Sequence, residues 1–220
     1  MKKTMLILAV LSLAVVSCRD KTPKTTGDAP LATAVDTTGK EMWNGYMKIA
    51  PTDIEGNIVQ RIGDEWMLIT AGTPDSYNTM TAGWGGMGII WSTPVSFIAV
   101  RNTRHTYGFL QKNDLYTLTF FGGGEKEAMT YLGTHSGRDG DKVAQTNLTP
   151  METPLGSMSF AQATMILECR KLYEDKLDPK SMFDDEIAKD YLKNDERHVL
   201  FLGEIVNVWV KVATDAPAER

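Results

Sequence analysis

Three side chains that can carry positive charge gather at the end of a predicted strand. The stretch FIAVRNTRHTYGF, residues 97–109, begins as an apolar, β-prone run and then presents Arg101, Arg104 and His105 within five positions. The planar guanidinium of an arginine matches two phosphate oxygens at once. A helix that starts near Thr103 would add its free backbone N–H groups to the same region. These residues alone leave two interpretations open, an anion site and the commoner solvated strand end.

Two further stretches carry polar groups suited to a ligand. Residues 78–86, NTMTAGWGG, combine small and hydroxyl side chains with Trp84, so their backbone would lie flat against a planar ring; a strand with a core tryptophan is the alternative. Residues 134–144, THSGRDGDKVA, follow a predicted helix with a glycine-rich turn, for which a plain charged turn is the alternative. The donors in that turn are Ser136, Arg138 and Lys142.

The elements that must position these residues are mostly strands. Apolar, β-prone runs predict strands over 65–72, 79–91, 94–100, 115–121 and 198–212, and the run over 159–177 is ambiguous. Shorter helical signals cover 52–62, with Thr52 as the cap, and 103–113, 125–135 and 184–194. Many strands with short helices between them indicate a mainly β fold, a β-barrel with short helices, and not a βαβ alternation.

Composition and missing motifs exclude several classes of protein. The chain has 220 residues, 42% of them hydrophobic, and a net charge of -5, which fits one domain and argues against a nucleic-acid-binding protein. The glycine motifs of Rossmann and P-loop nucleotide sites and the GxSxG nucleophile elbow are absent. Three widely spaced histidines do not make a zinc site, so we expect no metal.

The N-terminal residues read as an export signal. Residues 1–17 combine two lysines with a short apolar run, and the ending VVSC resembles a bacterial lipobox in which Cys18 becomes lipidated. We therefore expect a lipoprotein-type signal peptide over 1–17, a lipidated cysteine with a flexible tether over 18–40, one domain over 41–214 and a disordered tail over 215–220. Such a protein is extracytoplasmic and anchored to a membrane by lipid, in the periplasm or at the cell surface.

The remaining cysteine, Cys169, lies in the apolar run ATMILEC. With Cys18 lipidated, no intramolecular disulfide is possible. A buried, inert thiol is the expectation for Cys169, ahead of a redox role.

Six segments in the same order resemble the flavin reductase-like, flavoredoxin-type family. They are WMLITAG, YNTMTAGWGGMGIIWSTPVSFIAVRNTRHTYGFL, YTLTFF, GTHSGRDGDKVAQTNLTP, LECRKLYED and HVLFLGEIVNVWV, and they span roughly residues 43–212. No single segment is specific, but the order is. The resemblance implies a split β-barrel that binds FMN non-covalently and forms a homodimer.

The same resemblance assigns roles to individual residues. Residues along the isoalloxazine ring would be Asn78, Thr79, Met80, Thr81 and Trp84. Contacts to the phosphate or ribityl chain would come from Arg101, Arg104 and Thr106, and from Ser136 and Lys142 in the second anion-contacting turn. His198 would lie near the flavin, where it steers a donor or moves a proton, with a structural histidine as the alternative. Relatives often carry an aromatic residue where His105 stands, which puts a stacking role there in doubt.

These residues together favour an FMN-binding oxidoreductase. The FMN phosphate carries one to two negative charges near neutral pH, so an acidic protein needs local cations to hold it. Reductases of the family oxidise NAD(P)H, but reduced nicotinamide is not normally supplied outside the cytoplasmic membrane, so the electron donor is either NAD(P)H or a redox protein. The alternative function is a non-catalytic lipoprotein that binds flavin or another ligand.

Overall fold

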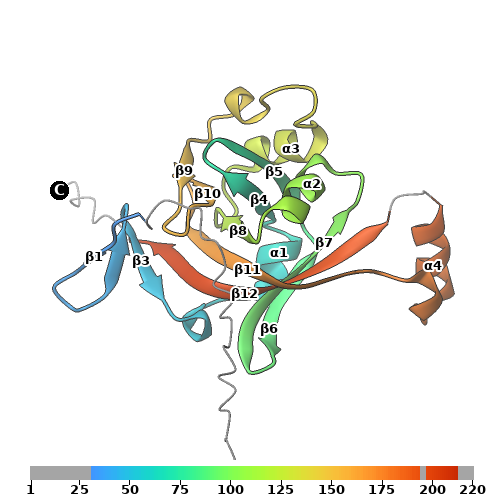
Figure 1. Ribbon diagram of the computed structural model, residues 1–220, viewed down its shortest axis with the longest axis horizontal. Coiled ribbons are helices and arrows are strands. Elements are labelled where there is room, and N and C mark those ends of the chain that lie inside the picture. Colours follow the sequence, from blue (N-terminus) through green and yellow to red (C-terminus); the bar gives the residue numbers. More distant parts are fainter. Residues whose placement is uncertain (1–30, 194–196, 213–220) are drawn as a thin grey trace, which may run out of the picture.

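The computed structural model describes residues 31–193 and 197–212 (Figure 1). The expected signal peptide, the expected lipidation site at Cys18, the first part of the expected tether and the expected tail over 215–220 lie outside these residues. Within the described part of the chain, no helix is both long and apolar enough to cross a membrane.

Two long antiparallel strands form the spine of the molecule. β12 (His198–Lys211) pairs along one edge with β11 (Met165–Lys176). Along its other edge, the first half of β12 pairs with β7 (Thr93–Arg101) and the second half pairs with β3 (Tyr46–Ile49). One strand therefore serves two separate neighbours, which splits the sheet at the middle of β12.

The remaining strands close this sheet into a barrel. β11 pairs with β8 (Leu115–Phe120), which pairs with β4 (Met67–Thr73), which pairs with β5 (Ser76–Ala82). The chain then runs from β5 into β6 (Gly85–Ile90), and β6 pairs with β7. All these pairs are antiparallel, and the predicted mainly β fold with short helices is confirmed.

Two small strand groups extend this framework. β1 (Ala34–Val35) and β2 (Glu41–Trp43) continue the sheet beyond β3. β1 falls inside the segment expected to be a tether, so regular structure begins before the expected domain boundary at residue 41. β9 (Pro150–Glu152) and β10 (Met158–Phe160) form a separate two-stranded sheet.

The interior of the barrel is apolar and closely packed around Tyr116. The hydroxyl of Tyr116, which is fully buried, lies 2.8 Å from the Ser96 hydroxyl. A Cβ atom on Gly203 would lie 2.3 Å from the same Tyr116 oxygen, so β12 needs a glycine at this crossing. Cys169 is fully buried beside this pair, and burial raises the pKa of its thiol to about 12. The expected buried thiol is confirmed.

In the described residues, four α-helices and three short 3-10 turns connect the strands. α1 (Ile58–Gly63) is capped by Asn57, and not by Thr52, because the Asn57 side chain accepts from two N–H groups of the first turn. α2 (His105–Lys112) follows β7 with Arg104 as its N-cap. α3 (Lys126–Thr134) follows β8. The 3-10 turns are Pro51–Asp53, Val143–Gln145 and Pro179–Ser181.

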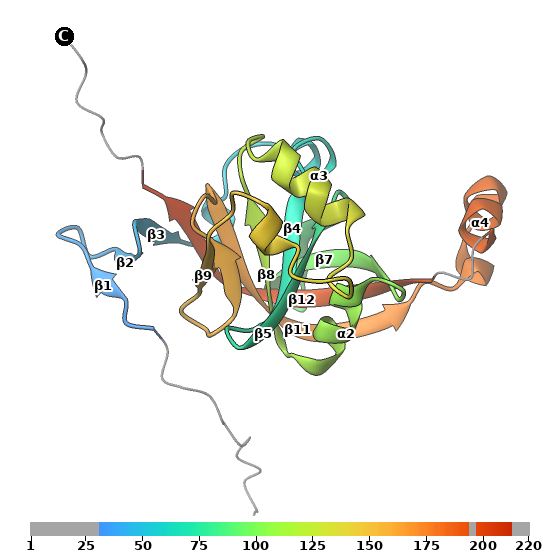
Figure 2. The same ribbon diagram turned by 90° about the horizontal axis from the view of Figure 1, so that it is seen from above.

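α4 (Asp185–Leu192) stands apart from the other helices. It lies between the ends of β11 and β12, which project from the barrel as an arm, and Figure 2 shows it at the far end of that arm. In contrast, α2 packs against β4 and β5, and α3 packs against β5. Among the described helices, α4 is thus the one that the arm carries.

Candidate functional site

Three adjoining cavities lie where β5, β7, β12 and the start of α2 come together. We call them the basic cavity (360 Å³), the central cavity (150 Å³) and the outer cavity (540 Å³). The central cavity shares Met80 and Arg104 with the basic cavity, and Trp84 and His198 with the outer cavity. Arg101, the last residue of β7, lines all three, so the cavities form one continuous site.

The basic cavity collects cationic side chains from three segments of the chain. Arg101 ends β7, Arg104 precedes α2, and Arg138 and Lys142 belong to the turn after α3. The Arg104 guanidinium donates to the carbonyl of Gly133 at the end of α3 (3.0 Å), which joins two of these segments. Because like charges that share a cavity repel one another, this arrangement favours an anion among them.

Asn78 and Thr106 form a buried wall of the basic cavity. The Asn78 amide donates to the Thr106 hydroxyl (2.6 Å) and to the Thr79 carbonyl (3.2 Å). A Cβ atom on Gly137 would lie 2.1 Å from the side-chain amide oxygen of Asn78. The turn after α3 therefore packs directly against the Asn78 side chain, and a residue larger than glycine would displace it.

Lys142 has a structural task in addition to its place in the basic cavity. Its ammonium group donates to the carbonyls of Leu132 (2.7 Å) and His135 (3.0 Å), which α3 leaves without helical partners. An ammonium has three N–H groups, so these two bonds leave one for another acceptor. Burial, and secondarily the charge of Arg104, lower the pKa of Lys142 to about 8.

The basic cavity also contains Arg138 and His105, which the sequence offered as polar groups but to which the family resemblance assigned no cofactor contact. The resemblance favoured Ser136 and Lys142 over Arg138. The Arg138 guanidinium nevertheless donates to the Thr103 carbonyl (3.0 Å), and its backbone N–H donates to the Ser136 hydroxyl (3.2 Å). His105 is the first residue of α2. Burial, and then the charges of Arg138, Lys142 and Lys112, lower the pKa of His105. Two other lining residues, His135 and Gly137, carry no recognisable signal in the sequence alone.

The central cavity brings the aromatic residues of the site together. It is lined by Met80, Thr81, Trp84 and His198 among others. The ring of Trp84 is 60% exposed, and its centroid lies 5.0 Å from that of His198. His198 stands opposite Arg101 in the β12–β7 pair, which places the histidine beside the arginine common to all three cavities. Unlike a core tryptophan, Trp84 thus offers a ring face to a ligand.

The strand alternation of β5 separates the four consecutive residues expected along a flavin ring. Asn78 and Met80 line the basic cavity, whereas the Thr79 hydroxyl bonds to Thr70 (2.9 Å) and to the Ile69 carbonyl (3.3 Å). Thr79 lines none of the three cavities. Thr81 lines the central cavity, but its hydroxyl donates to the Met129 carbonyl of α3. Successive side chains of a strand point to opposite faces, so the Thr79 side chain faces away from the basic cavity that Asn78 and Met80 line.

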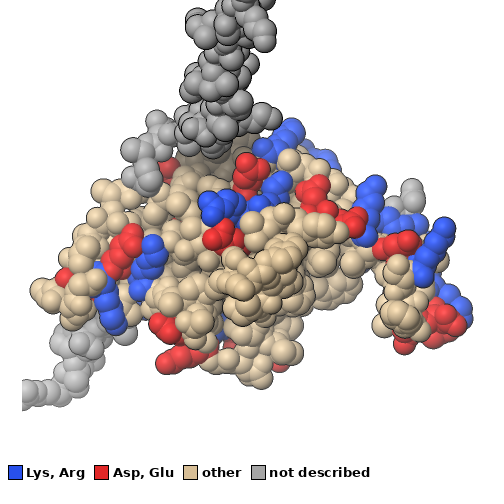
Figure 3. Space-filling view, turned by 60° about the horizontal axis from the view of Figure 1, so that its bottom comes forward, with Lys and Arg blue, Asp and Glu red and all other residues tan. Residues whose placement is uncertain are grey.

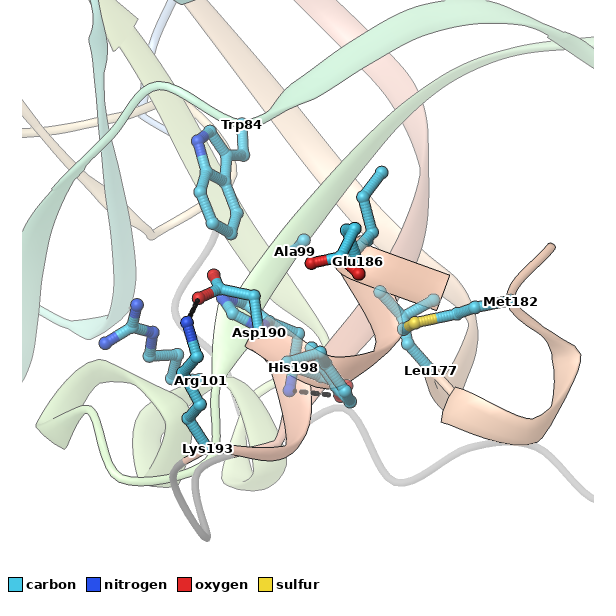
Figure 4. A pocket seen from close by; sticks show the side chains of 11 residues that line it. Trp84, Ala99, Arg101, Leu177, Met182, Glu186, Asp190, Lys193 and His198 are labelled. Carbon is cyan, nitrogen blue, oxygen red and sulfur yellow. Dashed lines mark hydrogen bonds and ion pairs between the residues drawn. The ribbon is translucent and has the colours of Figure 1, made fainter. Parts of the chain in front are cut away.

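The outer cavity lies between the barrel and the arm that carries α4. Figure 4 shows Trp84 on one side and Leu177 and Met182 on the other, with the ion pair of Asp190 and Lys193 drawn as a dashed line. This cavity was not predicted, because it depends on how the arm folds back toward Trp84. In the described part of the chain, no group of three or more His, Cys, Asp or Glu residues is arranged to hold a metal ion.

Comparison with known proteins yields one family and several similar folds. Residues 59–218 match the model of the flavin reductase like domain. An FMN-binding protein from Thermus thermophilus is 24% identical (TM-score 0.50; 66% of this chain and 70% of that chain covered). An FMN-binding flavin reductase-like enzyme from Shewanella baltica is 14% identical (TM-score 0.55; 76% and 77% covered). The flavoredoxin of Desulfovibrio vulgaris (Miyazaki F) is 22% identical (TM-score 0.52; 66% and 68% covered).

At these identities the structural neighbours establish the fold, and they agree with the split-barrel arrangement described above. No protein of curated function is detectably similar to this sequence.

Proposed function

Because the chain belongs to the flavin reductase like domain family, we propose that it binds FMN non-covalently and passes electrons through it as an oxidoreductase. The observation that carries this proposal is that Arg101 lines both the basic cavity and the central cavity, which differ in character. One cavity is cationic and the other is bordered by the exposed ring of Trp84. A flavin mononucleotide has the matching asymmetry, a phosphate at one end and a planar ring at the other.

The residues of the basic cavity fit a phosphate group. Three arginines and one lysine line it, and an arginine fork binds two phosphate oxygens at once. The first N–H groups of α2 have no acceptor within the helix and add donors at the same edge. Gly137 has no side chain, so none projects from this position into the part of the basic cavity beside Asn78. The donors and the shape together suit an anion of phosphate size.

Individual residues take different parts in holding the cofactor. Arg101 and Arg104 would bind the phosphate, with Thr106, Ser136 and the remaining N–H of Lys142 as further donors. Asn78, Met80, Thr81 and Trp84, which line the basic and central cavities, would lie along the ring. Thr79 would contribute through its backbone, since its hydroxyl bonds to Thr70. Bound flavin supplies the capacity to accept and release electrons. His198, at the junction of the central and outer cavities, would hold or move a proton near the ring.

We also propose that the protein forms a homodimer. Ile89, Ile90 and Trp91 at the tip of the β6–β7 hairpin are exposed, at 63%, 39% and 67%. Figure 3 shows a broad uncharged area on the face that this hairpin occupies, with charges of both signs around it. Trp91 and Ser92 both have positive φ (52° and 58°), a costly conformation for residues other than glycine. An apolar, strained tip of this kind is typical of a contact surface.

The lipid anchor at Cys18 and an extracytoplasmic location remain part of the proposal on sequence grounds. They bear on the electron donor, because NAD(P)H is not normally supplied there.

The second candidate function is a lipoprotein that binds flavin without turning it over. One experiment distinguishes it from a reductase. Protein loaded with FMN is mixed with NADH without oxygen, and its absorbance near 450 nm is followed. Bleaching within seconds identifies a reductase, and bleaching only by dithionite identifies a carrier or binder with another donor.

A further inference from the structure

We propose that the outer cavity binds an uncharged, planar aromatic molecule that lies next to the cofactor. This inference rests on the proposed flavin site and adds to it the chemical class of the second ligand. The outer cavity shares Trp84, Ala99, Arg101 and His198 with the central cavity. A molecule in the outer cavity is therefore a direct neighbour of whatever fills the central one.

Aromatic rings border the outer cavity from the barrel to the arm. The ring centroids of Trp84 and His198 are 5.0 Å apart, and those of His198 and Tyr191 are 5.7 Å apart. Both distances lie in the range of favourable aromatic pairs, so Trp84, His198 and Tyr191 form a chain of contacting rings. The ring of a ligand could pack against the end of this chain. Trp84 is the exposed end of this chain of rings and has a ring face to offer.

The size and lining of the outer cavity suit a small apolar molecule. Its 540 Å³ lies within the range of roughly 300–1,000 Å³ found for small-molecule sites. Leu177 and Met182 line it from the arm, and Ile187 lines it from α4 although this side chain is 61% exposed. When an apolar ligand enters the cavity, the exposed Ile187 side chain is removed from water, which favours binding.

The charges at the outer cavity argue against a charged ligand. Asp190 pairs with Lys193 (2.8 Å) and Glu186 pairs with Lys189 (2.7 Å), so the carboxylates of α4 already have their counter-ions. A charged ligand that entered would lose water without gaining an ion partner from α4, and Arg101, which also lines this cavity, is assigned above to the phosphate of the cofactor. An uncharged ring avoids this cost.

A matched pair of probes tests this inference. The mature protein is titrated by calorimetry with 2-naphthol, which is uncharged at pH 7, and with 2-naphthoate, the anion of similar size. We expect 2-naphthol to bind at least tenfold more tightly than 2-naphthoate. The variant Ile187→Asp places a carboxylate in the lining and should weaken 2-naphthol at least tenfold. Leu192→Asp makes a like change on the same helix, outside the lining, and should leave it unchanged.

The same samples separate this inference from the proposed function. Both substitutions are at exposed positions, and circular dichroism checks that the fold is retained. If FMN binds but 2-naphthol does not, or if the two aspartate variants behave alike, the inference is wrong and the flavin site stands. Tighter binding of 2-naphthoate than of 2-naphthol also overturns it. If 2-naphthol binds as expected but FMN does not, the aromatic site stands and the proposed function fails.

Discussion

The hydroxyl of Tyr191 on α4 makes two hydrogen bonds with the backbone of His198 on β12. It accepts from the His198 N–H (2.8 Å) and donates to the His198 carbonyl (3.3 Å). α4 has no fully buried residue, so little apolar packing holds it in place. This pair of bonds therefore ties the helix that closes the outer cavity to the strand that carries His198.

Replacing Tyr191 by phenylalanine should release α4 without unfolding the barrel. The change removes both bonds and keeps the ring, and a lost hydrogen bond costs about 1 kcal/mol. We expect amide hydrogen exchange over residues 185–192 to become about fivefold faster or more, with the barrel strands unchanged. Tyr173→Phe is the control, since the Tyr173 hydroxyl donates to Asp175, two residues away on the same arm, and not to β12. Equal exchange in both variants would contradict this role of Tyr191.

The pKa of Lys142 predicts that anion affinity falls in mildly alkaline solution. Its value of about 8 means that the ammonium is charged below pH 8 and becomes neutral above it. The contribution of Lys142 to FMN binding is therefore present below pH 8 and is progressively lost above it. The dissociation constant of FMN, measured between pH 6.5 and 9.5, should rise above pH 8. In Lys142→Met this rise should flatten; an unchanged profile in the variant would show that another group titrates.

Gly203 should be intolerant of a side chain because of its contact with Tyr116. A methyl group there would lie 2.3 Å from the Tyr116 hydroxyl, and crowding of this kind costs typically about 1–3 kcal/mol. We expect Gly203→Ala to lower the free energy of unfolding in urea by that amount. Gly88→Ala is the matched control in a strand, because no atom lies within 4 Å of its added methyl. Removing the hydroxyl as well, in Gly203→Ala with Tyr116→Phe, should recover part of the loss.

The uncharged hairpin tip predicts the effect of a charge at Trp91. If this tip is a dimer contact, Trp91→Asp should shift the protein toward the monomer in sedimentation velocity, because an unpaired carboxylate would be buried in the contact. Val59→Asp introduces the same charge at another exposed apolar position, on α1, and should leave the association unchanged. A wild-type protein that is monomeric at high micromolar concentration would refute the dimer.

Local sequence patterns predicted most of the long strands and the basic end of the site, because both depend on neighbours in the chain. The single strand expected over 79–91 is wrong, since β5 ends at Ala82 and β6 begins at Gly85. Arg101 and Arg104 stand where β7 ends and α2 begins, and a strand that ends in arginines before a helix is visible in a few residues. Asn78 and Met80 were identified together with Thr79, although the two-residue period of a strand places Thr79 on the other face. The sequence alone shows this alternation, so it also predicts that a contact from Thr79 on the cofactor would come from its backbone.

Contacts between distant segments explain what the sequence did not predict. The outer cavity exists because Tyr191 bonds to His198 across the end of the arm, and nothing in the segment 184–194 encodes that partner. Arg138 enters the basic cavity because its turn folds back on Thr103, 35 residues earlier. The lowered pKa of Lys142 was not predicted either, because it depends on the burial of a side chain that binds the carbonyls of Leu132 and His135.

The central claim is that Arg101 and Arg104 hold the phosphate of FMN beside Trp84. Its most direct test is a titration of FMN into the apoprotein, followed by flavin absorbance and fluorescence. The wild type should bind stoichiometrically. Arg104→Ala should weaken binding by on the order of 1.5–3 kcal/mol, since it removes a charge-assisted contact.

Arg170→Ala is the control for that titration, because Arg170 is exposed, pairs with Glu204 and lines none of the three cavities. This variant should bind FMN as the wild type does. A wild-type protein that leaves the flavin spectrum unchanged, or an Arg104→Ala variant that matches Arg170→Ala, would contradict the account.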